Sequence, residues 1–353
     1  MTVWIQNPFD NLPGEGFRKM RYALMAEAFV RAGHDVVVWT SDFSHATKRR
    51  RALSGEAQDG VAIRLVGTLP YFRNVSFRRV ASHVAYARRF EREAMRAVAE
   101  GMARPGLVVT SFPTISAAEA SVRLARRLGA KSVVDVQDAW PETFERILPR
   151  WALAPLRAKA RRLFREADFV TGVCDRYREL TGRSDYRRAY LGIEPGPCPE
   201  PPRSRTGRGR IAYVGGVGRT YDLDTVRRAA ESLGMDLAVA GGANYLGRRE
   251  LEEFLAGCDV GVIPMRDDSW VGLPNKLFDY AKAGLPVASS LGGETAALLE
   301  KYACGATYRP GDAGSLAEAV RAALRCEAMA SRRMCEAEFS AGPIYDEYAR
   351  VLV

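Results

Sequence analysis

The chain has 353 residues, and 47% of them are hydrophobic, which is enough to fill two ordinary cores, so we expect two domains. No segment reaches the roughly 20 consecutive apolar residues of a membrane span, and the first residues lack a basic start followed by an apolar stretch. These features argue against an exported or membrane-spanning chain, and we expect a cytoplasmic protein whose six scattered cysteines stay reduced.

Positive charge is concentrated in the first half of the chain. The net charge is +10, but residues 1–200 hold 33 Lys and Arg against 22 Asp and Glu, whereas residues 201–353 hold 19 against 20. A basic surface on one half alone indicates two modules with different partners.

The first half alternates short β-branched runs with helical patterns, which is typical of a parallel sheet covered by helices on both faces. We expect strands at residues 3–6, 35–40, 61–66, 107–110, 132–136 and 169–173, and helices at residues 16–32, 77–101, 114–128 and 153–166. Ligands of such sheets bind in the loops that follow the strands.

The predicted helix over residues 77–98 is amphipathic and strongly basic. Its apolar stripe consists of Phe77, Val80, Val84, Ala87, Phe90, Ala94 and Val98. Six arginines lie off the stripe, namely Arg78, Arg79, Arg88, Arg89, Arg92 and Arg96. The helix either packs its stripe on the sheet with the arginines in solvent, or lies on an anionic membrane surface. The candidate contacts for an acceptor or a membrane are Arg78, Arg79, Arg88 and Arg89.

Residues 195–209 are dense in Pro, Gly and polar residues without periodicity, which is typical of a linker. A second α/β pattern follows, with strands expected at residues 210–214, 235–240, 259–263 and 287–290. We therefore predict an N-terminal domain over residues 1–195, a linker over 196–209, a C-terminal domain over 210–335, and a final helical segment within 336–353.

The strongest local signal is LPNKLFDYAKAGLPV at residues 273–287, where Pro274 suits the first turn of a helix and Gly284 its end. Asn275, Lys276 and Asp279 share one polar face of this helix. A diphosphate needs fixed positive charge and free backbone N–H groups, and a ribose needs an acceptor, so this helix start can serve a nucleotide. The alternative is a solvated face with a pair between Lys276 and Asp279.

A glycine-rich turn follows the strand at residues 210–214, with Gly215, Gly216 and Gly218. Glycines let the backbone approach a phosphate, and Arg219 can add charge. Tyr221 stands where a dinucleotide fingerprint has its third glycine, so an ordinary turn between strand and helix is the alternative.

Asp222 and Asp224 form a DxD pair, a pattern that can hold a metal ion. At a predicted helix start, acidic residues are explained more simply by capping and by the helix dipole. We favour capping over metal binding.

Two turns of the first half also follow predicted strands and therefore lie where ligands bind in such sheets. After the first strand come Gly14, Glu15 and Gly16, followed by a predicted helix start. After the strand at residues 132–136, the segment DVQDAWPE brings Asp138 to the ligand-binding edge of the sheet. Asp138 is either catalytic or a cap that precedes Pro141.

Taken together, two halves joined by a linker, an N-terminal glycine turn, DVQDAWPE and PNKLFDYAKAGLPV resemble the retaining glycosyltransferases of the GT-B class, in particular those that build bacterial surface polysaccharides. The resemblance implies two Rossmann-like domains that face each other across a cleft, with the donor nucleotide on the C-terminal domain. It implies that Asp279 binds the ribose and that Lys276 and Arg219 meet the diphosphate. It further implies that residues 14–16 close over the donor and that the final helix crosses back to the first domain.

One departure from the class concerns the acid that contacts the donor sugar. The class often has two glutamates separated by seven residues, and the position eight before Asp279 is Val271. The missing acid is expected at Asp267 or Asp268, with Gly272 as a further sugar contact.

The predicted activity is a retaining, metal-independent transfer of a sugar, similar to that of hexosyltransferases, with Asp138, Arg219 and Lys276 in catalysis and no cofactor. The donor is a nucleotide-diphosphate sugar, UDP-sugar preferred, and the acceptor a polysaccharide or a polyprenyl-linked glycan at the inner membrane face. One alternative is a nucleotide-sugar epimerase on the same scaffold, which needs no acceptor. A basic nucleic-acid-binding protein is another, although the sequence has no zinc, helix-turn-helix or RNA-binding motif.

Overall fold

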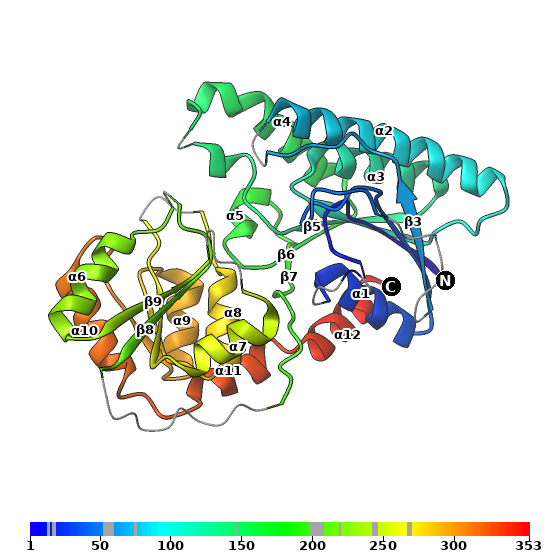
Figure 1. Ribbon diagram of the computed structural model, residues 1–353. Helices are drawn as coiled ribbons and strands as arrows, with labels where there is room; N and C mark the ends of the chain where they lie inside the picture. The colour runs from blue at the N-terminus through cyan, green and yellow to red at the C-terminus, as the bar shows by residue number, and fades with distance from the viewer. Residues whose placement is uncertain are drawn as a thin grey trace. The chain divides into compact units, whose positions relative to one another are not determined.

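The computed structural model describes residues 1–353 apart from 13–14, 16–18, 52–59, 74–75, 146, 198–207, 219, 242–245 and 267–269. The chain forms two compact units: unit 1 comprises Met1–Gly192 and Ala341–Val353, and unit 2 comprises Ile193–Ser340 (Figure 1). The units divide a few residues away from the ends expected at 195 and 336. Each unit is an α/β layer structure with a parallel sheet, which confirms the predicted pair of Rossmann-like domains.

Unit 1 is built on a sheet of seven strands in the order β3-β2-β1-β4-β5-β6-β7. The strands are β1 (Thr2–Gln6), β2 (Asp35–Ser41), β3 (Val61–Val66), β4 (Leu107–Phe112), β5 (Lys131–Val136), β6 (Phe169–Gly172) and β7 (Arg187–Arg188). Neighbouring strands are parallel throughout, so their carboxyl ends meet at one edge of the sheet. The loops at that edge carry the site residues of unit 1.

Helices cover both faces of this sheet (Figure 1). On one face lie α2 (Phe77–Ala99) and α3 (Ile115–Leu128), with Phe90 packed against Trp39 of β2. On the other face, α1 (Arg21–Arg31) and α12 (Ala341–Leu352), the first and last helices of the chain, lie side by side. The remaining helical elements of unit 1 are η1 (Glu142–Phe144), α4 (Arg150–Glu166) and α5 (Tyr177–Thr181).

A buried polar network fixes α12 to unit 1. Arg21 of α1 donates from Nε and Nη2 to the two carboxylate oxygens of Asp135 in β5, at 2.8 Å each. Thr171 of β6 donates to Asp135 at 2.7 Å and hydrogen-bonds the hydroxyl of Tyr348 in α12 at 3.1 Å. Burial alone would raise the pKa of Asp135, but the guanidinium of Arg21 holds that pKa below its ordinary value. The terminal helix is therefore attached through side chains of three other elements.

The expected strands and helices of unit 1 are present, and most of their ends agree with the structure to within two residues. The clearest error concerns the first helix, which begins at Arg21 and not at residue 16, because Met20 still has an extended backbone (φ −102°, ψ 176°). Helix α4 begins earlier than predicted, at Arg150. Helix α5 and strand β7 were not predicted, because five and two residues are too few for a periodic pattern.

The apolar stripe predicted for α2 divides into two halves. From Tyr86 onward it packs on the sheet, and Phe90 is fully buried. In the first half, Phe77, Val80 and Val84 are 95%, 60% and 36% exposed. The alternative in which the whole stripe packs on the sheet is therefore wrong for the first two turns of α2.

Unit 2 holds a second parallel sheet, of five strands in the order β12-β11-β10-β8-β9. Its strands are β8 (Arg210–Val214), β9 (Asp236–Ala240), β10 (Val260–Ile263), β11 (Val287–Ser289) and β12 (Gly305–Thr307). Its helices are α6 (Leu223–Leu233), α7 (Arg248–Ala256), α8 (Asn275–Lys282), α9 (Gly293–Lys301), α10 (Ala313–Ala323) and α11 (Ala330–Glu338).

Helix α8 is locked onto the sheet of unit 2 by one buried tyrosine. The hydroxyl of Tyr280 lies 3.1 Å from the carbonyl oxygens of Ala212 and Val262 and accepts the N–H of Val214 at 3.1 Å. These contacts join α8 to β8 and β10. Because α8 follows β10 in the chain, the helix starts at the carboxyl ends of these strands. The opposite face of the sheet packs on α6 and α10.

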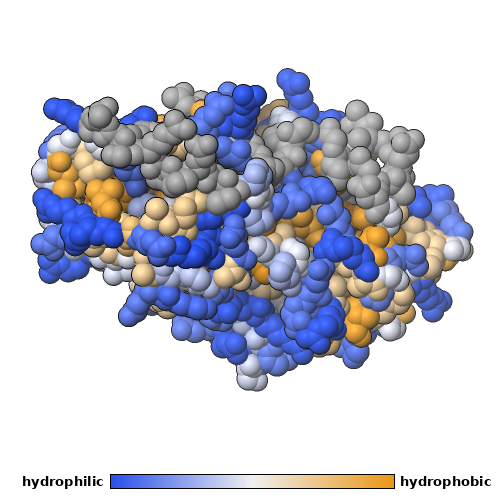
Figure 2. Space-filling view, turned by 90° about the horizontal axis from the view of Figure 1, so that it is seen from below, coloured by the Kyte–Doolittle hydropathy of each residue, from blue (hydrophilic) through white to orange (hydrophobic). Residues whose placement is uncertain are grey.

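The face of the molecule shown in Figure 2 is mostly hydrophilic, with small apolar patches between the hydrophilic side chains. Within the residues that the structure describes, each helix is too short or too polar to cross a membrane.

Candidate active site

The start of α8 lies at the ligand-binding edge of unit 2, after the carboxyl end of β10. Pro274 precedes the helix in an extended conformation (φ −80°, ψ 145°), Asn275 is its first residue, and Gly284 follows the helix with a φ of +72°. The first N–H groups of a helix have no partner within it, and together with the helix dipole they favour an anion. The helix predicted from PNKLFDYAKAGLPV is therefore confirmed, and its start is suited to a phosphate.

Lys276 lies buried at this helix start, against two aromatic rings. Its Nζ is 3.9 Å from the ring centre of Tyr221 and 5.2 Å from that of Tyr213, and the residue is 5% exposed. Burial lowers the pKa of Lys276 to about 8, against the opposing effect of the Asp279 carboxylate. The alternative of a fully solvated polar face is wrong for Lys276, although Asn275 is exposed.

The turn after β8 brings backbone close to the ammonium group of Lys276. Gly215 has a φ of +117°, and a Cβ there would lie 3.6 Å from Nζ of Lys276. A Cβ on Gly241 would come within 2.0 Å of the carbonyl oxygen of Gly215, so both positions require glycine. Gly216 and Gly218 are exposed in the same turn. A side chain at Gly215 would lie against the ammonium group of Lys276, and one at Gly241 would displace the backbone of Gly215.

The two aspartates after this turn, Asp222 and Asp224, interact with residues of α6. Asp222 caps the helix, accepting the N–H of Thr225 at 3.2 Å and its hydroxyl at 2.8 Å, so the predicted capping role is confirmed. Asp224 pairs with Arg227 at 2.5 Å. Within the described ranges, no three His, Cys, Asp or Glu side chains gather closely enough to hold a metal ion.

The remaining candidates of unit 2 divide between described and undescribed positions. Arg219, Asp267 and Asp268 lie outside the described residues. Gly272 is buried, and its carbonyl accepts the hydroxyl of Thr295 at 2.7 Å. Asp279 is half-buried on α8, one turn after Lys276.

In unit 1, Asp138 follows β5 at the ligand-binding edge. Its Oδ1 accepts the N–H of Ala139 at 2.9 Å, and burial raises the pKa of its carboxyl group. The capping alternative for Asp138 is wrong, because Pro141 takes the N-cap position of η1 and no side chain caps that helix. A partly buried carboxyl group with a raised pKa is suited to proton transfer.

The N-terminal glycine turn is only partly described. Gly14 and Gly16 lie outside the described residues. Glu15 accepts hydrogen bonds from the N–H of Leu12 and from Nε of Arg51, both at 2.8 Å. Its carboxylate therefore ties the turn after β1 to the loop after β2.

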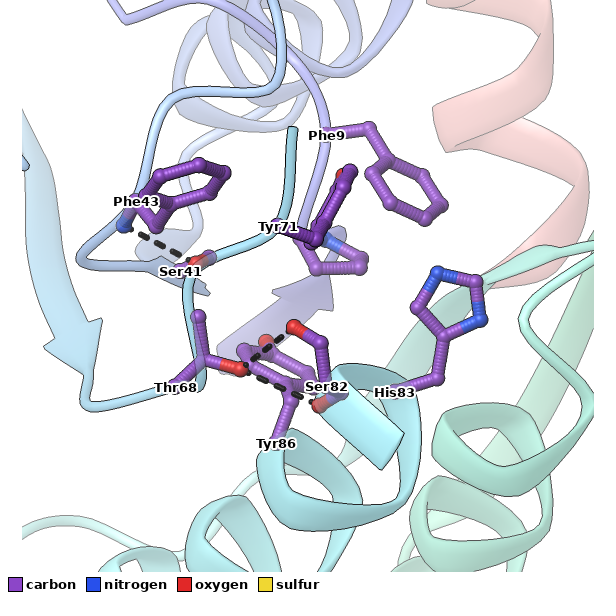
Figure 3. Close-up of a pocket in the computed structure, with 9 residues that line it drawn as sticks. Phe9, Ser41, Phe43, Thr68, Tyr71, Ser82, His83 and Tyr86 are labelled. Carbon is purple, nitrogen blue, oxygen red and sulfur yellow. Dashed lines mark hydrogen bonds between the residues drawn. The ribbon is translucent and has the colours of Figure 1, made fainter. Parts of the chain in front are cut away.

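A small pocket, partly open to solvent, lies at the carboxyl ends of β1, β2 and β3 (Figure 3). It is lined by Pro8, Phe9, Ser41, Phe43, Thr68, Tyr71, Ser82, His83 and Tyr86. Phe9 and His83 approach each other at its rim, and the hydroxyl of Thr68 bonds to Ser82 at 3.0 Å in its floor. No local pattern in the sequence predicts this pocket, because its residues come from four separate segments.

Arg79 differs from the other arginines of α2 by pointing to this pocket. Its guanidinium carbon lies 5.3 Å from the ring centre of Phe9, and its Nε donates to His83 at 3.3 Å. Arg78 and Arg88 are exposed, as a membrane-facing role requires, whereas Arg89 is half-buried. Arg79 therefore lies against residues of the pocket and is not part of a solvent-facing row.

Two comparisons with protein families match the two halves of the chain. Residues 20–191 match the family described as Glycosyl transferase 4-like domain, and residues 209–326 match Glycosyl transferases group 1. Among curated proteins, none matches the sequence significantly.

Solved structures share the fold over the whole chain. A sucrose-phosphate synthase from Thermosynechococcus elongatus is 12% identical with a TM-score of 0.69, covering 99% of this chain and 98% of that one. HepE from Anabaena, solved with UDP and glucose, is 14% identical with a TM-score of 0.64, covering 100% and 99%. A glycosyltransferase from Rickettsia africae is 10% identical with a TM-score of 0.61, covering 99% and 97%. The two family matches and the common architecture show that the chain is a glycosyltransferase with the GT-B fold.

Proposed function

We propose that the protein transfers a sugar from a UDP-sugar to a polysaccharide or lipid-linked glycan, with retention of the anomeric configuration and without a metal ion. The observation that carries the proposal is Lys276, a buried ammonium group at the start of α8 beside the Gly215 turn. A departing diphosphate accumulates negative charge as the anomeric bond breaks, and a fixed cation with helix N–H groups stabilises it. UDP is preferred because HepE, which shares the fold, was solved with UDP-glucose.

Asp138 is the residue of unit 1 that suits the acceptor. Its raised pKa makes it a base of moderate strength, able to accept the proton of an acceptor hydroxyl as that oxygen attacks the sugar. Asp279 is proposed to bind the ribose of the donor, and Arg219 its diphosphate. The turn with Gly14 and Gly16 is proposed to close over the donor, and Asp267 or Asp268 to contact its sugar.

A thermal-shift experiment tests the donor and the metal independence together. UDP, GDP and their sugars are added to the full chain with and without EDTA, and a ligand that binds the folded state raises Tm. We expect UDP to give the larger shift, of equal size in both conditions. A shift that requires Mg²⁺ or Mn²⁺ contradicts the metal-independent proposal.

We further propose that the enzyme meets its acceptor at the inner face of the membrane. The first half of α2 exposes Phe77, Val80 and Val84 together with Arg78 and Arg88. A basic residue near anionic lipid contributes about 1 kcal/mol, and apolar side chains add to it. Binding to phosphatidylglycerol vesicles in a sedimentation assay should fall with salt and with Arg78→Glu/Arg88→Glu, and equal binding to neutral vesicles contradicts the proposal.

A further inference from the structure

The pocket of unit 1 has cations gathered around aromatic rings at its rim. The guanidinium carbon of Arg79 lies 5.3 Å from the ring centre of Phe9 and 5.8 Å from those of Tyr71 and Trp140. Nζ of Lys48 lies 4.9 Å from the Tyr71 ring. Two cations, Lys48 from the loop after β2 and Arg79 from α2, therefore act on the same ring. They repel each other, and an anion between them would relieve that repulsion.

Two histidines complete this cluster in their neutral form. Nδ1 of His45 lies 2.6 Å from the hydroxyl of Tyr71 and 3.2 Å from Nζ of Lys48, and His83 lies beside Arg79. Burial first, and then the neighbouring positive charges, lower the pKa of His45 to about 4 and that of His83 to about 3. At neutral pH these rings offer hydrogen bonds without adding charge, and the cluster retains the charges of Arg79 and Lys48.

Exposed apolar side chains stand next to Tyr71 and Arg79 in the sequence. Phe72 directly follows Tyr71 and is 71% exposed. Phe77 and Val80 flank Arg79 along the first turn of α2 and are 95% and 60% exposed. Such a surface matches a ligand with a compact anionic group at one end and a hydrocarbon chain at the other.

We propose that the cluster of His45, Lys48, Tyr71, Arg79 and His83 binds the diphosphate of a lipid-linked acceptor. Arg79 and Lys48 contact the phosphate oxygens, and the side chains of Phe72, Phe77 and Val80 contact the first units of the lipid. The inference rests on the proposed glycosyl transfer to a lipid-linked acceptor and names the residues that select it. Asp138, whose carboxyl group lies within the electrostatic influence of Arg79, is then near the end of the acceptor that reacts.

Calorimetric titration of the full chain tests the proposal. Saturating UDP first occupies the donor site, and farnesyl diphosphate, inorganic pyrophosphate and farnesol are then titrated separately. We expect farnesyl diphosphate to bind more tightly than the other two. Arg79→Gln and Lys48→Gln should each raise its Kd about tenfold or more, because each removes a hydrogen bond to a charged group.

Matched variants separate the loss of a charge from the loss of a lipid contact and from unfolding. Arg92→Gln, an exposed arginine of the same helix, should leave the Kd unchanged, and Phe77→Ser should weaken farnesyl diphosphate but not pyrophosphate. If Arg79→Gln lowers Tm strongly, Lys48→Gln carries the test, since Lys48 lies in a half-exposed loop position. Unchanged affinity in Lys48→Gln and in a folded Arg79→Gln overturns the proposal.

Two further outcomes are distinguishable. Equal affinity for pyrophosphate and farnesyl diphosphate assigns the cluster to free diphosphate and overturns the lipid-linked source. Absence of UDP binding contradicts the proposed donor site, in which case titration without UDP still tests the cluster. Normal UDP binding with no binding of either diphosphate overturns this inference alone.

Discussion

Arg21 in unit 1 and Lys276 in unit 2 are buried cations at the ligand-binding sides of their sheets, and they are accommodated in opposite ways. Arg21 in unit 1 is 2% exposed and donates to both oxygens of Asp135 at 2.8 Å. Lys276 in unit 2 is 5% exposed and lies against the rings of Tyr213 and Tyr221. A carboxylate compensates the first charge by direct contact, whereas ring faces compensate the second only weakly.

The difference appears in the protonation of the two groups. Burial by itself lowers the pKa of Arg21, but Asp135 raises it above its ordinary value. Burial lowers the pKa of Lys276 to about 8, and the Asp279 carboxylate opposes this only in part. A compensated cation holds a fold together, and a poorly compensated one is ready to bind an anion. Four predictions test this contrast.

The largest expected effect is on stability and comes from Arg21. Arg21→Met leaves Asp135 buried without its counterion, and we expect the free energy of unfolding to fall by about 3–5 kcal/mol. Chemical denaturation measures it. The double variant Arg21→Met/Asp135→Leu should recover much of the loss, because no buried charge remains. A single variant as stable as the wild type would show that the pair does not hold unit 1 together.

The second prediction concerns catalysis by Lys276. Lys276→Met fills the same space without charge, and we expect kcat to fall by about 10² to 10³ while Tm is unchanged or higher. Lys282→Met on the same helix, which removes an ion pair with Glu252 at 2.8 Å, should leave kcat near the wild-type value. Normal turnover by Lys276→Met would mean that the diphosphate binds elsewhere.

The third prediction concerns the acceptor side of unit 1. Asp138→Asn should lower kcat by about 10², because the amide cannot accept a proton. In the wild type, activity should rise with pH through the raised pKa of Asp138 as the carboxylate forms, and the variant should lose this limb of the profile. The pH dependence of kcat distinguishes this role from a purely structural one, which would leave the limb in place.

The smallest expected effect is the pH dependence of UDP binding. Only the protonated Lys276 attracts the diphosphate, and it loses its proton as the pH rises through about 8. UDP affinity should therefore fall, by up to about tenfold per pH unit above that value. Lys276→Arg should remove this dependence, since guanidinium keeps its charge. Calorimetry at pH 7, 8 and 9 measures both proteins, and identical slopes would exclude Lys276 as the titrating group.

Local patterns in the sequence determined the two parallel sheets, most helix limits and the capping by Asp222. Hydrophobic periodicity, a proline at a helix start and an aspartate at an N-cap act within a few residues, so one sequence is sufficient to read them. The PNKLFDYAKAGLPV helix is of this kind, and its limits agree with the structure.

Only the tertiary structure decided which side chains meet. Arg21 and Asp135 are 114 residues apart, and their pairing depends on the strand order of the sheet. Lys276 is buried because β8 brings Tyr213 beneath it and the following turn adds Tyr221, a contact that spacing along α8 could not reveal. Arg79 faces Phe9 and Trp140 because the loops after β1 and β5 bring these rings close to α2. Parallel strands joined by crossover helices bring distant loops to one edge, and no local pattern records which residues face one another there.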